Sequence, residues 1–183
     1  MKTVVIIIVV LFLANGLSAQ ENTPQNESSK STKASKKEQQ EAALTQQFRE
    51  KAALVESKRF VLEADFLINK AGEQISVSSV LNFIMVDSNM AVIQVGNTVG
   101  LGPNGSGGLT AKGKITSWDV DKNEKKNSIN VRMNVNTSIG FYSVSMFIPA
   151  GNNTTAKLSP ATLDFVGKLV PLEMSSVYEG RSF

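Results

Sequence analysis

Acid–base chemistry in this chain depends on carboxylates alone, because its 183 residues include neither histidine nor cysteine. The absence of histidine removes the usual general base, the commonest zinc ligand and every Ser-His-Asp triad. The absence of cysteine removes disulfides, thiolate metal sites and cysteine nucleophiles. We therefore assign no catalytic residue, no cofactor, no cofactor-binding residue and no metal ligand, and expect a protein that is not an enzyme.

The densest group of carboxylates is Asp119, Asp121 and Glu124, which we expect in a turn beside three lysines. An Asp-x-Asp turn can hold Ca²⁺, but the glycine and the distal glutamate of known calcium loops are not there. We interpret the segment as a solvated, charged hairpin. Glu63 and Asp65 alternate with apolar residues in an expected strand, so they are expected to face water.

A glycine-rich segment carries two partial nucleotide-binding motifs. Residues 100–105 match G-x-G-x-x-G, and residues 108–115 match a phosphate-binding P-loop except for Ile115 at its last position. Both motifs need a helix to follow, and a β-type run follows instead. Glycines permit positive φ, so the segment is first a broad turn, but its backbone N–H groups could also form an anion nest. The candidate binding loop consists of Gly102, Asn104, Gly105, Gly107 and Gly108.

Residues 1–19 have the features of a secretory signal peptide. Lys2 precedes the apolar run Val4–Ala14, and Leu17-Ser18-Ala19 forms the expected cleavage region. The apolar run is too short for a membrane span, which needs about 20 residues. We expect the mature protein to begin at Gln20, to have no stable membrane insertion after signal cleavage, and to be periplasmic or secreted without a lipoprotein cysteine.

The rest of the chain divides into a polar tether and one domain. Residues 20–37 contain no large apolar side chain and are expected to be disordered. Residues 38–183 are expected to form a single β-rich domain that begins with a helix over 38–58. The helix has an apolar stripe of Leu44, Phe48, Ala52 and Val55, which predicts docking on the domain; a membrane-surface or partner-binding helix is the alternative.

After residue 60 the apolar period changes to two, which indicates strands. Several short strands at roughly ten-residue spacing predict a mainly β fold, an antiparallel barrel-like or sandwich domain with one N-terminal amphipathic α-helix. The helix is expected to cover an open face or close one end, against strands around 83–95 that are apolar on both faces. The expected strands are 60–68, 83–86, 90–95, 109–118, 128–136, 139–148, 154–158 and 168–172.

Charge and the aromatic residues give little sign of a nucleic-acid partner. From Phe60 to Phe183 the chain has ten basic and ten acidic residues, so the domain carries no net charge. Nucleic-acid binding would require a basic stripe on the domain. Trp118, the only tryptophan, is expected to pack in the core or at its rim.

Five sequence blocks form a recognisable combination: FVLEAD (60–65), VSSVLNFI (77–84), AVIQVG (91–96), GPNGSGGLT (102–110) and GKI (113–115). Through these blocks the chain resembles the DUF4251 family, exported Bacteroidetes proteins of unknown function. The resemblance extends over about residues 40–183 and implies a barrel-like β domain behind a signal peptide and a helix. It supplies no catalytic residues.

Three functions remain open at this point. The first is a non-enzymatic, exported β-barrel-like protein that binds a small or apolar ligand or a partner, the partner being an unknown small molecule or an envelope protein. The second is a structural or interaction protein of the cell envelope with a filled core. The third is a hydrolase that uses carboxylates alone. A cavity of at least about 300 Å³ favours the first over the second, and two buried carboxylates about 5–10 Å apart would favour the third.

Overall fold

The computed structural model describes residues 27–96 and 108–182, with side chains from residue 36 onward within those ranges. The chain divides into two units, Met1–Lys37 and Glu38–Phe183. The second unit contains every described strand.

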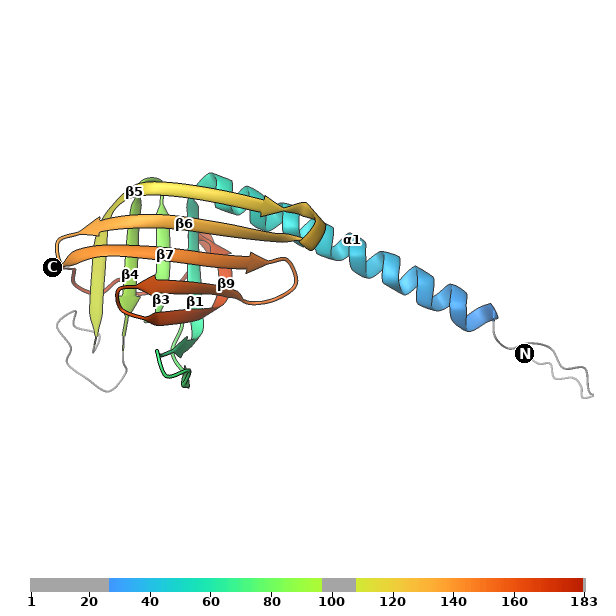
Figure 1. Cartoon of the computed structure of the whole chain (residues 1–183), viewed down its shortest axis with the longest axis horizontal. Coiled ribbons are helices and arrows are strands. Elements are labelled where there is room, and N and C mark those ends of the chain that lie inside the picture. Colours follow the sequence, from blue (N-terminus) through green and yellow to red (C-terminus); the bar gives the residue numbers. More distant parts are fainter. Residues whose placement is uncertain (1–26, 97–107, 183) are drawn as a thin grey trace, which may run out of the picture. The chain divides into compact units, whose positions relative to one another are not determined.

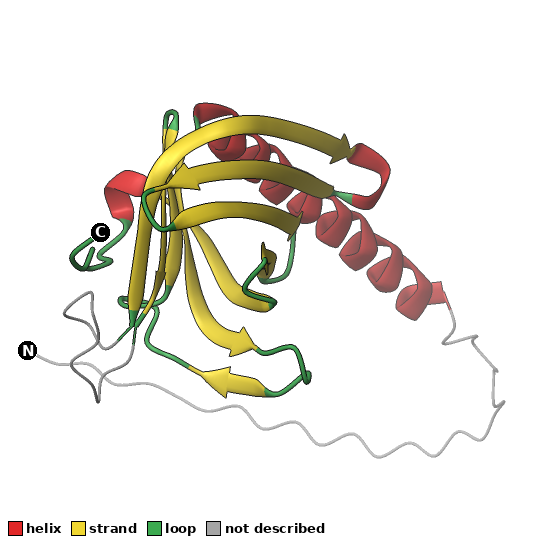
Figure 2. Ribbon diagram, turned by 60° about the vertical axis from the view of Figure 1, so that its left-hand side comes forward, coloured by secondary structure: helices red, strands yellow, loops and turns green. Residues whose placement is uncertain are grey.

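Nine strands of the described chain form one antiparallel sheet, and eight of them close into a barrel (Figures 1 and 2). The barrel order is β1-β3-β4-β5-β6-β7-β8-β9, closed by pairing between β1 and β9, while β2 pairs only with one end of β1. The strands are β1 (Arg59–Ile68), β2 (Gln74–Ser76), β3 (Phe83–Asp87), β4 (Met90–Val95), β5 (Leu109–Asn123), β6 (Ser128–Thr137), β7 (Gly140–Pro149), β8 (Thr154–Ser159) and β9 (Leu163–Pro171). The predicted mainly β, barrel-like fold with one N-terminal helix is confirmed.

Side chains fill the barrel interior. On β6 every second residue is buried, as the alternation predicted: Ile129, Val131, Met133 and Val135. They meet the inward side chains of the other strands in one apolar cluster. An eight-stranded barrel is just wide enough for side chains to fill it.

Strand β1 departs from the expected alternation at a β-bulge. Its pairing with β9 shifts between Ala64 and Phe66, which turns Leu67 inward and leaves Phe66 and Ile68 only partly buried. A two-residue period running through the whole expected strand 60–68 would put Phe66 and Ile68 on the same face as Ala64, and the bulge shows that this regular alternation was wrong beyond Ala64. An extra residue in one strand reverses the facing of every residue after it.

Helix α1 (Glu27–Ser57) carries the predicted apolar stripe and closes the core. Phe48, Ala52 and Val55 are buried in the same cluster as the barrel interior, whereas Leu44 remains 36% exposed. The helix begins at Glu27, before the expected start at residue 38. Once a helix has nucleated, adding residues costs little, and a glutamate in the first turn interacts favourably with the helix dipole.

The outer face of β1, β3 and β4 is covered by residues 172–182, which we call the C-terminal strap. The strap begins with a 3₁₀ helix, η2 (Leu172–Met174), and lies outside the barrel (Figure 2). Its apolar side chains pack on a second, smaller cluster formed by Val61, Phe83 and Val92. Strands β3 and β4 are thus buried on both faces as predicted, but the strap and not the helix covers their outer side.

A buried glutamine holds the strap in place. Gln94 is fully buried; its Nε2 donates to the carbonyls of Leu81 and Tyr178 at 3.1 and 2.8 Å. Its Oε1 accepts from Thr110 Oγ1 and from the Gly180 amide, both at 2.8 Å. Every polar atom of this side chain is therefore used, as a buried amide requires.

Strand β5 is longer than expected, and this relocates the acidic cluster. Asp119 and Asp121 lie in the strand, paired in register with Arg132 and Asn130 of β6. The expected turn at Asp119–Glu124 was wrong; the chain turns at the 3₁₀ helix η1 (Glu124–Lys126). Trp118 and Val120 alternate with the aspartates and pack against the core, which extends the strand through this segment. Trp118 also packs against Phe60, as expected for a rim residue.

Candidate functional site

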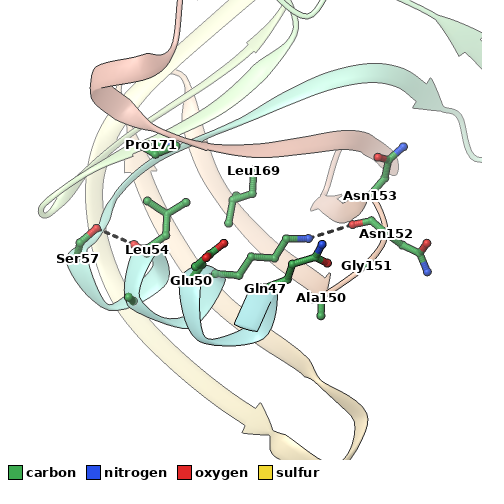
Figure 3. A pocket seen from close by; sticks show the side chains of 12 residues that line it. Gln47, Glu50, Leu54, Ser57, Ala150, Gly151, Asn152, Asn153, Leu169 and Pro171 are labelled. Carbon is green, nitrogen blue, oxygen red and sulfur yellow. Dashed lines mark hydrogen bonds between the residues drawn. The ribbon is translucent and has the colours of Figure 1, made fainter. Parts of the chain in front are cut away.

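A groove of about 1170 Å³ lies between α1 and the rim of the barrel (Figure 3). One wall is a face of the helix adjacent to its buried stripe. The opposite wall combines the β7–β8 turn with the end of β9. The lining residues are Gln47, Glu50, Lys51, Ala53, Leu54 and Ser57 from the helix, and Ala150, Gly151, Asn152, Asn153, Leu169 and Pro171 from the barrel. We call this cavity the helix–rim groove.

The groove has an apolar part formed by Leu54 and Leu169. Both side chains are only partly buried and pack against the barrel core from outside it. Leu54 follows Gln47, Glu50 and Lys51 at helical spacing, so these residues share one side of the helix. The groove therefore places an apolar surface beside polar side chains, the usual composition of a small-molecule site.

Lys51 is the cation of the groove. Its Nζ donates to the carbonyl oxygens of Pro149 at 2.6 Å and Asn152 at 3.1 Å. Burial lowers the pKa of Lys51 from its ordinary value of 10.5. An ammonium has three N–H donors, and two carbonyls use two of them. The remaining donor can bind an anionic group of a ligand.

The barrel wall is fitted closely to the helix at Gly151. A Cβ at this position would lie 2.8 Å from Leu44 Cδ2, closer than side-chain atoms approach one another. A backbone hydrogen bond also holds this turn: the Ala150 amide donates to the Asn127 carbonyl at 2.8 Å. Gly151 thus lies against Leu44 of the helix, and Lys51 bonds to carbonyls on either side of the same turn.

Glu50 is exposed at the mouth of the groove and accepts a hydrogen bond from Gln46 Nε2 at 2.9 Å. Its carboxylate lies in water, whereas the Lys51 ammonium is partly withdrawn from it. Because water screens an exposed charge more strongly, Lys51 has more influence than Glu50 on a ligand inside the groove.

The candidate binding loop is only partly visible. Gly102, Asn104, Gly105 and Gly107 lie outside the described residues. Gly108 comes directly before β5, where a Cβ would lie 1.8 Å from the Val95 carbonyl oxygen. At this position glycine is required because two backbones come together. The structure does not bring Gly108 into the helix–rim groove.

The carboxylates of the described chain do not converge on a cleft. None of its aspartates or glutamates is among the buried polar residues, and no group of three or more acidic side chains there could hold a metal ion. Asp119 and Asp121 lie on the outer face of β5. Within the described residues, no helix has the length and apolar character needed to cross a membrane.

Sequence reasoning missed the groove residues. Lys51 and Asn152 are separated by 101 positions, so only the closed barrel brings them together. The available signal was a second helical face, Gln47-Lys51-Leu54, beside the stripe that was identified.

Comparisons with known proteins agree on one family. The model of the domain of unknown function DUF4251 matches residues 42–169. The crystal structure of a DUF4251 family protein from Bacteroides eggerthii is similar to this chain, with 30% sequence identity and a TM-score of 0.56, over 78% of this chain and 99% of that one. No curated protein matches the chain. The match covers more than half of the sequence, and the fold agrees: the chain belongs to the DUF4251 family.

Proposed function

We propose that this protein is an exported, non-enzymatic binding protein that holds a small amphipathic ligand in the helix–rim groove. The observation that carries the proposal is the groove itself, a cavity of about 1170 Å³ with an apolar wall and one partly buried ammonium. Cavities that bind small molecules usually measure about 300–1,000 Å³. The groove is therefore large enough for a ligand with an extended apolar body.

The chemistry of the lining suggests an apolar body with one anionic group. Leu54, Leu169 and Pro171 offer apolar surface, and Lys51 offers a positive charge whose desolvation is only partly offset by two carbonyls. A carboxylate, sulfonate or phosphate beside Lys51 would compensate that charge. Long-chain carboxylates and similar amphiphiles match both features.

Export is part of the proposal and is supported by residues 1–19. A short apolar run followed by Leu17-Ser18-Ala19 has the character of a cleaved signal. We expect periplasmic or secreted mature protein that begins at Gln20. Intact-mass measurement of protein from its own source tests this, and a retained Met1 segment in the membrane fraction would contradict it.

A second function is favoured by one observation, the filled barrel interior. Because side chains occupy the space between the strands, the protein could act in the envelope through its surface alone. This interpretation expects no small-molecule binding in the groove. The equal numbers of basic and acidic residues from Phe60 onward support a partner other than nucleic acid in either case.

The test uses anilinonaphthalene sulfonate, which has an apolar body and one anionic group and fluoresces when it leaves water. We expect saturable binding to the cooperatively folded protein. Lys51→Met removes the cation while keeping an unbranched side chain of similar length, and should weaken binding about three- to tenfold. Leu54→Gln should also weaken binding, because it places a polar amide in the apolar wall of the groove.

Lys125→Met is the matched control, because Lys125 is exposed in η1 and does not line the groove. Its binding should equal that of the wild type. The proposal is refuted if the dye does not bind, or if Lys51→Met and Leu54→Gln bind it as tightly as the wild type and Lys125→Met do. Either result would favour the alternative in which the protein acts through its surface. Thermal unfolding must be cooperative in each variant, since partly folded proteins also bind this dye.

A further inference from the structure

The outer face of β5, β6, β7 and β8 carries a ladder of small polar side chains. Strand register places Ser117, Asn134, Ser143 and Ser159 in one cross-strand row. The neighbouring row consists of Asp119, Arg132, Ser145 and Lys157. Both rows line a shallow depression of about 420 Å³. We call these two rows the polar ladder.

The side chains in the ladder are unusual for strands. Asparagine is depleted in β-strands, yet β6 has it at three outward positions, Asn130, Asn134 and Asn136. Outward positions of a solvated sheet usually favour threonine or long polar residues. A sequence that departs from local preference without a gain in packing indicates a functional surface.

Two exposed aromatic rings stand at either end of the ladder on β7. Phe141 and Phe147 are 53% and 48% exposed, and strand alternation puts both on the outer face with Ser143 and Ser145 between them. They are six positions apart along the strand, which corresponds to about 20 Å. The β5, β6 and β7 strands run side by side along this face (Figure 1).

The charges of this face are balanced. Arg132 Nε lies 3.5 Å from Asp119 Oδ2, and Lys157 Nζ lies 3.7 Å from Asp164 Oδ2. The face therefore has no basic stripe for a polyanion and no acidic field for a cation. What it offers is a series of hydroxyl, amide and paired charged groups, all of which can donate or accept hydrogen bonds.

One hydrogen bond orders the centre of the ladder. The Ser143 hydroxyl donates to Asn134 Oδ1 at 2.8 Å, which orients that amide with its Nδ2 donors away from Ser143. Asn134 and Ser143 both line the depression. Because this hydrogen bond already orients the Asn134 amide, that side chain loses less conformational freedom on binding a ligand than an unbonded asparagine would.

We infer that the polar ladder binds a neutral oligosaccharide chain laid along β7. Sugar rings have apolar C–H faces, which can stack on Phe141 and Phe147, and hydroxyl edges, which can bond with Asn134, Ser145 and Arg132. The distance between the rings fits several linked sugars and not a single one. This site lies on other elements than the helix–rim groove and is independent of the function proposed there.

The test is affinity electrophoresis of the folded protein in gels that contain neutral polysaccharides: glycogen, galactomannan, arabinoxylan and mixed-linkage glucan. We expect at least one of them to retard the wild type. Phe141→Ala and Phe147→Ala should each weaken that binding roughly tenfold. Tyr178→Ala is the matched control, since this 61% exposed aromatic lies on the C-terminal strap, and it should bind as the wild type does.

The result separates this inference from the proposed function. Lys51→Met should retain polysaccharide binding even where it loses the amphipathic probe. No retardation by any of the four polysaccharides, or retardation that both phenylalanine variants keep, would overturn the inference. Self-association that Phe141→Ala and Phe147→Ala abolish, without polysaccharide binding, would also overturn it and would identify the face as a protein contact.

Discussion

The docking of α1 on the barrel can be tested at Phe48. This ring is 8% exposed and belongs to the same cluster as the barrel interior, with Ala52 and Val55 beside it on the helix. Phe48→Ala removes the ring and leaves a cavity between helix and barrel. We expect the variant to be folded but clearly less stable than the wild type.

The magnitude follows from the burial. A phenylalanine buries about 150–250 Å², which at about 25 cal/mol per Å² gives an upper bound of about 4–6 kcal/mol. Buried Phe→Ala substitutions cost about 3–5 kcal/mol. Because a helix on the outside of a barrel can settle into part of the space, we expect a loss of about 3 kcal/mol.

Urea unfolding, followed by circular dichroism, measures this loss as a shift of the midpoint with unchanged slope. Leu44→Ala is the matched control on the same helix. Leu44 is 36% exposed and packs over Gly151, so its truncation should cost about 1 kcal/mol. If the midpoint of Phe48→Ala equals that of the wild type, the helix is not part of the folded core, and the helix–rim groove loses one wall.

Three further predictions test other contacts. Gly167→Ala places a Cβ 1.9 Å from the Glu63 carbonyl oxygen, so we expect its free energy of unfolding in urea to fall by more than about 2 kcal/mol. Gly72→Ala is the control: it has open space around it but a φ of +83°, and should lower the free energy of unfolding by only about 1 kcal/mol. Equal losses in the two variants would contradict the close approach at Gly167. Gln94→Leu removes four hydrogen bonds and leaves their partner groups unsatisfied, so it should lower the free energy of unfolding by about 2–4 kcal/mol. It should also speed amide hydrogen exchange in the C-terminal strap. Unchanged exchange would show that contacts other than those of Gln94 hold the strap. The pKa of Lys51 in the folded protein lies below its ordinary value of 10.5, so between these two pKa values the unfolded chain binds more protons than the folded chain. The stability of the wild type relative to Lys51→Met should therefore rise as pH increases toward 10.5. A constant difference in stability across urea titrations at several pH values would contradict this.

Regular alternation made the barrel predictable. On β6, a strict two-residue period identified the strand and its buried face. The strands at 139–148 and 154–158 were also expected, and they correspond to β7 and β8. The bulge in β1 was not predictable, because nothing in FVLEADFLI marks which residue is extra. The length of β5 was missed because Asp119 and Asp121 suggest a turn, whereas pairing with β6 overrides that preference.

The tertiary contacts around the strap and the groove were not predictable from local sequence. Gln94 looks like an ordinary polar residue in an apolar strand, and its partners Tyr178 and Gly180 come from the opposite end of the chain. The groove likewise joins Lys51 to a turn about 100 residues away. Apolar periodicity detects which face is buried, but it carries no information about which distant segment meets a polar residue.

The most direct test of the proposed function is a titration with decanoate, followed in proton–nitrogen correlation spectra of the folded protein. Decanoate has an apolar chain and one carboxylate, the two features that the helix–rim groove matches. We predict saturable shifts confined to residues that line the groove, in 47–57, 150–153 and 169–171, and a weaker response in Lys51→Met. The absence of saturable shifts, or shifts confined to the outer face of β5–β8, would contradict ligand binding in the groove.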